Sequence, residues 1–177
     1  MDKKLFRYEL LGFVFVCLLG TAMHFFFEWS NNSVFVGLFC PVNESVWEHL
    51  KLLYMPFIIW SIIEFFNFKS KKCFFFSRAA GILSGLLGTV FIYYTFTGAS
   101  GNESMVIDIA SFIIGVGVSF LIGYIILKNR RLHSLFAEIC SVLFLLVLFC
   151  LFILFTFAPP FIPLFEDMQN LSFGISL

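Results

Sequence analysis

The sequence predicts an all-α, polytopic membrane protein: a bundle of about five transmembrane helices, with the N-terminus inside the cell and the C-terminus outside. Three observations support this prediction. Hydrophobic residues make up 60% of the 177 residues and charged residues only 12%, whereas soluble domains are about 25% charged. Several apolar stretches are long enough to cross a bilayer, and basic residues lie in alternate connections between them. A chain of this length is expected to form one domain, residues 1–177.

Each predicted span has about the 20 residues that a helix needs to cross a hydrocarbon core of roughly 30 Å. The spans are residues 10–27, 50–68, 79–96, 105–127 and 135–157. The first one follows basic residues, as a signal peptide does, but its apolar run continues past the weak cleavage site at 21–23, so we expect an uncleaved helix. The last span is almost entirely Leu, Phe, Val and Ile, and we expect it to be the most exposed to lipid.

Small residues recur every four positions in the third and fourth predicted spans. The third contains Ser77, Gly81, Gly85 and Thr89, and the fourth contains Ser111, Gly115, Ser119 and Gly123. In lipid, such a spacing lets two helix backbones approach closely, where dispersion and weak hydrogen bonds hold them together. We therefore expect these two spans to form a tight pair.

The basic residues predict the orientation of the bundle. Ten of the eleven Lys and Arg residues lie before the first span, between the second and third, or between the fourth and fifth. Because basic residues stay in cytoplasmic segments, these three segments are predicted to lie inside. Only Lys51 falls on the other side. The pattern predicts a multi-pass protein of the cell membrane.

Polar side chains gather at the predicted outer ends of the first, second and fourth spans. They are His24, Glu28, Glu44, Ser45, Glu48, His49 and Asp108. On a helix, residues four apart share a face, so His24 would lie beside Glu28, and Ser45 beside His49. A carboxylate such as Asp108 is costly within a bilayer unless it faces a protein interior or a water-filled cavity. These residues mark the region where a functional site is expected.

Imidazole and carboxylate groups are ligands of zinc and other divalent metals. We predict His24, His49 and Asp108 as metal ligands, with a neighbouring glutamate as a fourth ligand or a general base. A metal-free alternative pairs Ser45 or Glu48 with His49, so that the candidate catalytic residues, counting Glu44 as a possible general base, are Glu44, Ser45, Glu48 and His49.

The metal-free alternative has a geometric difficulty, because Ser45 and His49 would lie one helical turn apart. In addition, neither a His-Glu-x-x-His nor a Gly-x-Ser-x-Gly motif is present. A purely structural alternative also stays open. Ser45 to Glu48 matches a helix capping box, and Trp47 would anchor the helix at the membrane interface. Capping does not account for His24, His49 or Asp108.

The last twenty residues, 158–177, contain Pro159, Pro160 and Pro163. Proline cannot continue a helix, so the fifth span is expected to end before them. The apolar residues that follow are too few to cross the membrane again. We expect an extended tail that packs over the outer face of the bundle and brings Asp167 near the polar cluster.

Two motifs carry a resemblance to a known family. Pro-Val-Asn-Glu-Ser-Val-Trp-Glu-His-Leu-Lys-Leu, from Pro41 to Leu52, resembles the hallmark of a family of small bacterial integral membrane proteins. The run Pro-Pro-x-x-Pro-Leu-Phe from Pro159 is similar to the C-terminal signature of that family, except that Leu171 stands where a small turn residue is usual. The resemblance covers the whole chain and implies a membrane location. The family is known only as a domain of unknown function, so no activity is implied.

Three functions are compatible with these patterns. The first is a membrane-embedded enzyme or lipid-handling protein, with a divalent metal such as zinc as candidate cofactor and a lipid or lipid-linked molecule as substrate. The second is a transporter or ion-conducting subunit, although no inverted repeat is evident. The third is a non-catalytic accessory protein. Membrane lipids are the expected partners, and nucleic acid is not, because no basic patch interleaved with aromatic residues is present. The sequence does not assign an oligomeric state.

Overall fold

The computed structural model describes residues 2–67, 72–102, 104–129, 134–167 and 169–175. Its long helices are α1 (Asp2–Trp29), α3 (Val46–Asn67), α4 (Phe74–Ser100), α5 (Met105–Asn129) and α6 (Leu135–Phe157). The short elements are α2 (Val34–Gly37), the 3₁₀ turn η1 (Pro163–Phe165), and the strands β1 (Glu166–Asp167) and β2 (Ser172–Phe173). All five long helices are long and apolar enough to cross a membrane, which confirms the predicted transmembrane bundle.

Four of the five long helices extend beyond the apolar stretches that predicted them, and α6 coincides with its stretch. For example, α1 begins eight residues before the predicted first span, and α4 begins five residues before the third, at Phe74. An apolar stretch marks the part of a helix that lies in hydrocarbon, while the backbone hydrogen bonds continue into polar flanking turns. The five spans were therefore placed correctly, and only α1, α3, α4 and α5 begin or end further out than their spans.

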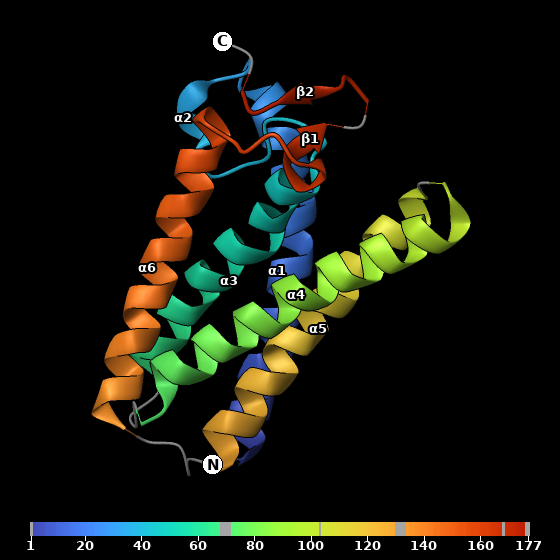
Figure 1. Cartoon of the computed structure of the whole chain (residues 1–177). Coiled ribbons are helices and arrows are strands. Elements are labelled where there is room, and N and C mark those ends of the chain that lie inside the picture. Colours follow the sequence, from blue (N-terminus) through green and yellow to red (C-terminus); the bar gives the residue numbers. More distant parts are fainter. Residues whose placement is uncertain (1, 68–71, 103, 130–133, 168, 176–177) are drawn as a thin grey trace.

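The two ends of the bundle differ in what covers them (Figure 1). At the N-terminal end, α1, α4 and α6 begin and α3 and α5 end. At the C-terminal end, α2 and the tail with β1 and β2 lie over α1, α3 and α6 (Figure 1). The core between the helices contains fully buried Val16, Phe57, Ile82, Val116 and Phe152, one from each long helix.

Helices α4 and α5 pack side by side and run obliquely away from α1 and α3 toward the C-terminal end (Figure 1). A Cβ atom added at Gly85 would lie 2.5 Å from the Gly115 carbonyl oxygen, and one added at Gly81 would lie 2.5 Å from the Ser119 carbonyl oxygen. Only glycine permits backbones this close. The predicted tight pair is confirmed. The buried share of α6 is the smallest among the five helices, as its composition predicted.

Gly85→Ala is expected to destabilise the protein by about 1–3 kcal/mol, because the new methyl group would push against the backbone of α5 and could not be accommodated by a side-chain movement. Gly88→Ala is the matched control, since a Cβ there would meet nothing within 4 Å. Thermal unfolding in detergent measures both variants. Equal stabilities of Gly85→Ala and Gly88→Ala would contradict the close contact.

The tail differs from the predicted extended segment. After Pro160 it forms η1 and a short antiparallel hairpin in which Glu166 pairs with Phe173. The hairpin turn requires a left-handed backbone at Leu171, with φ of 51°, a conformation that costs a non-glycine residue about 1–2 kcal/mol. The packing of Phe165 against Trp47, with ring centroids 4.9 Å apart, fixes the hairpin over the start of α3. The departure from the family pattern at Leu171 thus falls on a strained turn.

Candidate metal site

The turn before α3 fixes the backbone on which two of the site residues lie. The Ser45 hydroxyl oxygen accepts a hydrogen bond from the Glu48 N–H at 3.3 Å, which is the predicted N-cap. The Asn43 side-chain oxygen accepts one from the Ser45 N–H at 3.1 Å. The reciprocal half of the capping box is absent, because the Glu48 carboxylate instead accepts from the Val42 N–H at 3.0 Å. This network holds Glu44 just before the helix.

The C-terminal tail forms hydrogen bonds with the turn that precedes α3. The Asn43 side chain donates to the Gly174 carbonyl oxygen at 3.0 Å, and the Glu44 N–H stabilises the Asp167 carboxylate. The pKa of Asp167 is held below its usual value, because its hydrogen bonds from Asn170, Gln169 and Glu44 outweigh its burial. The expectation that Asp167 lies near the polar cluster is confirmed. Asp167 holds the backbone of the cluster and leaves the Glu44 carboxylate free to face the histidines.

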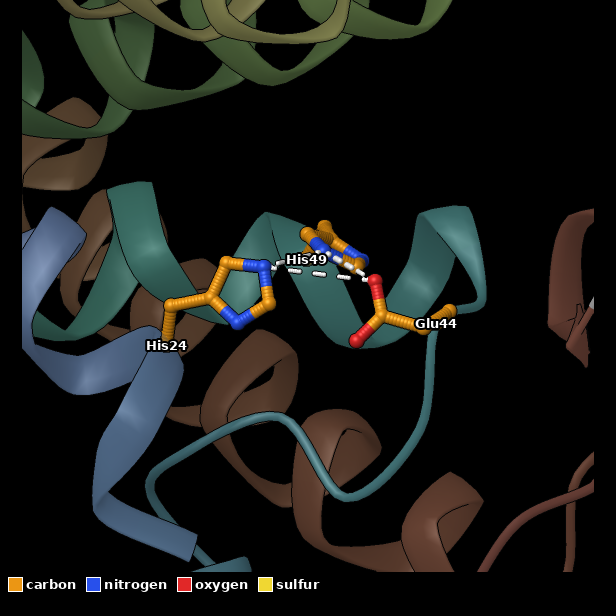
Figure 2. A group of neighbouring side chains, drawn as sticks. All are labelled: His24, Glu44 and His49. Carbon is orange, nitrogen blue, oxygen red and sulfur yellow. Dashed lines mark hydrogen bonds and ion pairs between the residues drawn. The ribbon is translucent and has the colours of Figure 1, made fainter. Parts of the chain in front are cut away.

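Three side chains from separate segments converge at this place. His24 comes from α1, Glu44 from the turn and His49 from the first turns of α3, and all three point toward one another (Figure 2). The His49 Nε2 atom lies 3.3 Å from the Glu44 Oε2 atom and 3.4 Å from the His24 Nε2 atom. The third distance, from His24 Nε2 to Glu44 Oε2, is 3.9 Å. These are the potential ligand atoms of a metal ion.

The hydrogen bond on the far side of His49 fixes its tautomer. The Nδ1 atom lies 2.9 Å from the Ser45 carbonyl oxygen. A carbonyl oxygen can only accept, so Nδ1 carries the hydrogen, and the Nε2 lone pair of the neutral ring faces the cluster. Histidine ligands of metals are oriented in this way. The lone pair then faces a carboxylate oxygen, and two acceptors at this distance are stable together only with a proton or a metal ion between them.

The distances fit tetrahedral coordination. Zinc binds imidazole nitrogen and carboxylate oxygen at about 2.0–2.2 Å, which corresponds to about 3.3–3.5 Å between neighbouring ligand atoms of a tetrahedron. Two of the three observed distances lie at this value, and the third requires a small side-chain rotation. About a third of each side chain is exposed: 38% for His24, 38% for Glu44 and 32% for His49. An exposed three-ligand site leaves a fourth position for water or substrate.

The histidines also act on the charge of Glu44. A hydrogen bond from His49, together with the positive charge that either imidazole carries when protonated, holds the pKa of Glu44 below its usual value, although burial raises it. In the absence of metal, a proton can thus occupy the position between His49 and Glu44. Metal and proton compete for the same ligand atoms.

The lowered pKa of Glu44 predicts a pH dependence. A carboxyl group whose pKa is lower in the folded state contributes stability that is complete above its unfolded pKa and is lost as the pH falls through the folded value. Glu44→Gln is therefore expected to lose less stability than the wild type on acidification below about pH 4.5. Thermal unfolding in metal-free buffer across pH 3–6 measures this difference. Parallel curves for the two proteins would exclude a stabilising role of the Glu44 charge.

Glu48 and Ser45, the other two members of the predicted metal-free set, have structural roles. The Glu48 side chain is 2% exposed, and its Oε2 atom lies 2.6 Å from the Lys51 ammonium group. Its Oε1 atom accepts from the Thr156 hydroxyl of α6 at 3.1 Å. Ser45 is buried and caps α3, and His49 contacts its carbonyl oxygen, not its hydroxyl. A serine–histidine nucleophile pair is not formed.

Asp108 is not brought to the cluster, although it was predicted as a ligand. It lies in the first turn of α5, and the oblique course of α4 and α5 carries that turn away from the ends of α1 and α3 (Figure 1). Within the described ranges, the carboxylate that joins the two histidines is that of Glu44. Glu28 is exposed on the last turn of α1 and is not a member of this group.

Comparison with known proteins identifies a family, but no activity is known for that family. Residues 2–175 match a family described as "Family of unknown function (DUF6512)". No curated protein and no solved structure matches the chain.

Proposed function

This chain belongs to the DUF6512 family, whose function is unknown, and from the geometry of the site we propose that it is a membrane-embedded, metal-dependent hydrolase. His24, Glu44 and His49 are the proposed ligands of a divalent metal, with zinc as the first candidate. The observation that carries the proposal is the convergence of two imidazole nitrogens and one carboxylate oxygen, with the tautomer of His49 set by the Ser45 carbonyl oxygen. Two histidines and one glutamate are a ligand set of catalytic zinc enzymes.

Each residue has a definite role in this proposal. His49 binds through its Nε2 atom, while its Nδ1–H stays bonded to Ser45. His24 and Glu44 complete the set from α1 and from the turn, and Glu44 also reduces the net charge of the site. When bound, zinc in a three-ligand site lowers the pKa of a bound water to about 7, which supplies hydroxide at neutral pH. The exposure of the three side chains gives a substrate access to this position.

The surroundings of the site favour a lipid or lipid-linked substrate. The site lies where α1 ends and α3 begins, close to the boundary of the membrane-spanning segments. The distribution of basic residues predicts that this end lies outside the cytoplasm, at the level of the outer-leaflet headgroups. A separate open cavity of about 350 Å³, lined by Tyr93, Tyr94 and Thr97 of α4 and by Pro163 of the tail, among others, contains none of the three proposed ligands.

Hydrolysis can be tested on the protein in nanodiscs made of synthetic ester phospholipid labelled in one acyl chain. The metal is removed by chelation and zinc is added back. We expect release of labelled product, measured by mass spectrometry, with the zinc-loaded wild type and not with the chelated protein or with His49→Ala. Zinc binding without any metal-dependent product would contradict a hydrolase for this lipid class. Zinc flux into sealed liposomes, measured in parallel, would instead support the transporter alternative.

A further inference from the structure

A second group of ionisable side chains is buried at the N-terminal end of the bundle, away from the metal site. It consists of Arg78 on α4, Glu9 on α1 and Glu64 on α3, which are 0%, 5% and 0% exposed. This Arg78 triad was not predicted, since Arg78 was assigned to a cytoplasmic connection. Lys69 and Lys71, which follow α3 and which the sequence offers as partners for Glu64, lie outside the described residues.

Glu9 accepts a hydrogen bond from each of the two terminal nitrogens of Arg78. The guanidinium nitrogens Nη2 and Nη1 of Arg78 donate to the Oε1 and Oε2 atoms of Glu9 at 2.5 and 3.2 Å, a bidentate pair. Room for the guanidinium comes from α5, where Gly123 has no side chain; a Cβ there would lie 3.2 Å from Nη2. The ring of Phe74 covers the group, with its centroid 5.5 Å from the guanidinium carbon.

Glu64 has a weaker position in the triad. Its Oε2 atom lies 2.9 Å from the Arg78 Nη1 atom, but neither oxygen accepts a well-aligned hydrogen bond from the described residues. The Trp60 N–H, one turn earlier on α3, also acts on this carboxyl group, through a contact that is not well aligned. The charges that act on Glu64 from the neighbouring helices of the described chain are those of Arg78 and Glu9. The side chain is thus a fully buried carboxyl group beside an arginine that already has a carboxylate partner.

The charge count of the Arg78 triad does not balance. Arginine stays protonated in proteins, so two ionised glutamates would leave one uncompensated negative charge in an apolar interior. Isolated buried charges of this kind are strongly unfavourable. One bound proton removes the imbalance. Both carboxylate oxygens of Glu9 accept hydrogen bonds from Arg78, whereas Glu64 accepts no such bond from it, which leaves Glu64 as the group that can carry the proton.

We infer that the Arg78 triad is a proton-binding site and that Glu64 holds one exchangeable proton inside the bundle. The inference is independent of the proposed metal site, which lies at the other end of α1 and α3. Because the triad joins α1, α3 and α4, release of the proton would place a net negative charge between these three helices. Proton binding is therefore coupled to the packing of the N-terminal end.

Infrared spectroscopy of the full chain in nanodiscs tests the inference. An un-ionised carboxylic acid has a C=O stretching band that is separate from carboxylate bands and shifts when the exchangeable proton is replaced by deuterium. We expect this band in the wild type, its loss in Glu64→Gln and a changed frequency in Glu64→Asp. Glu44→Gln is the control and should keep the band, because His49 favours the ionised form of Glu44. Absence of the band from the wild type, or its survival in Glu64→Gln, would overturn the inference.

Unfolding temperatures give a second test that does not depend on spectroscopy. Glutamine has the shape of a neutral glutamic acid, so Glu64→Gln should keep the wild-type Tm within about 3 °C. Arg78→Met leaves both carboxyl groups without a cation and should lower the Tm by roughly 10 °C. If Glu64→Gln lowers the Tm as much as Arg78→Met does, Glu64 is needed as an anion and the inference is wrong.

Discussion

Replacement of His49 by alanine is expected to lower the affinity of the purified protein for zinc by more than about 100-fold. The loss should exceed the 10- to 100-fold effect that is usual for residues that only orient a ligand, because the substitution removes a ligand atom. His24→Ala and Glu44→Gln should weaken binding to a similar extent, since the three atoms form one set. Competition with a chromophoric chelator in detergent measures the affinities.

Two control variants separate the metal site from general effects of removing a histidine or a carboxylate. Glu28→Gln removes an exposed carboxylate one turn from His24 on α1 and should leave zinc affinity unchanged. His133→Ala removes the histidine that lies outside the described residues and should also be neutral. If either control loses as much affinity as His49→Ala, the bound zinc is not at the site shown in Figure 2.

Lys51→Met is expected to destabilise the protein by about 3–5 kcal/mol. Lys51 is 0% exposed, and its ammonium group donates to the Glu48 carboxylate at 2.6 Å, the Thr156 hydroxyl at 2.6 Å and the Gly37 carbonyl oxygen at 3.0 Å. These bonds join α2, α3 and α6. Without the ammonium group, Glu48 is a buried charge with no cation. Denaturant-induced unfolding in mixed micelles measures the loss.

The double variant Lys51→Met/Glu48→Leu distinguishes an unbalanced charge from a simple loss of packing. Removing both members of a buried pair often restores much of the stability that one removal costs. We therefore expect the double variant to be more stable than Lys51→Met alone. Strictly additive losses would show that the two side chains act independently and that the ion pair contributes little.

Features that depend on local sequence were predicted correctly. The spans follow from hydropathy, because each helix that crosses the bilayer needs an apolar stretch of its own, whatever the other helices do. The contact of Gly85 with the Gly115 backbone follows from small residues repeated every four positions. Lys51, the exception to the charge pattern, is explained by the structure: it is paired with Glu48 inside the bundle and is not a surface charge.

Features that depend on how the helices tilt against one another could not be predicted from local sequence patterns. Asp108 was grouped with His24 because the two lie at similar depths along their helices, but helix ends at one depth separate when two helices splay. Arg78 and Glu9 are 69 residues apart in the sequence, and neither belongs to a motif that would predict their contact. The hairpin of the tail depends on Leu171 adopting a positive φ, which local preference disfavours.

X-ray absorption at the zinc edge identifies the ligands of the metal in the zinc-loaded protein. We expect nitrogen and oxygen ligands at about 2.0–2.2 Å, with two imidazoles in the wild type and one in His49→Ala. A shell that contains sulfur at about 2.3 Å, or a spectrum unchanged by the loss of His49, would contradict a metal site made of His24, Glu44 and His49.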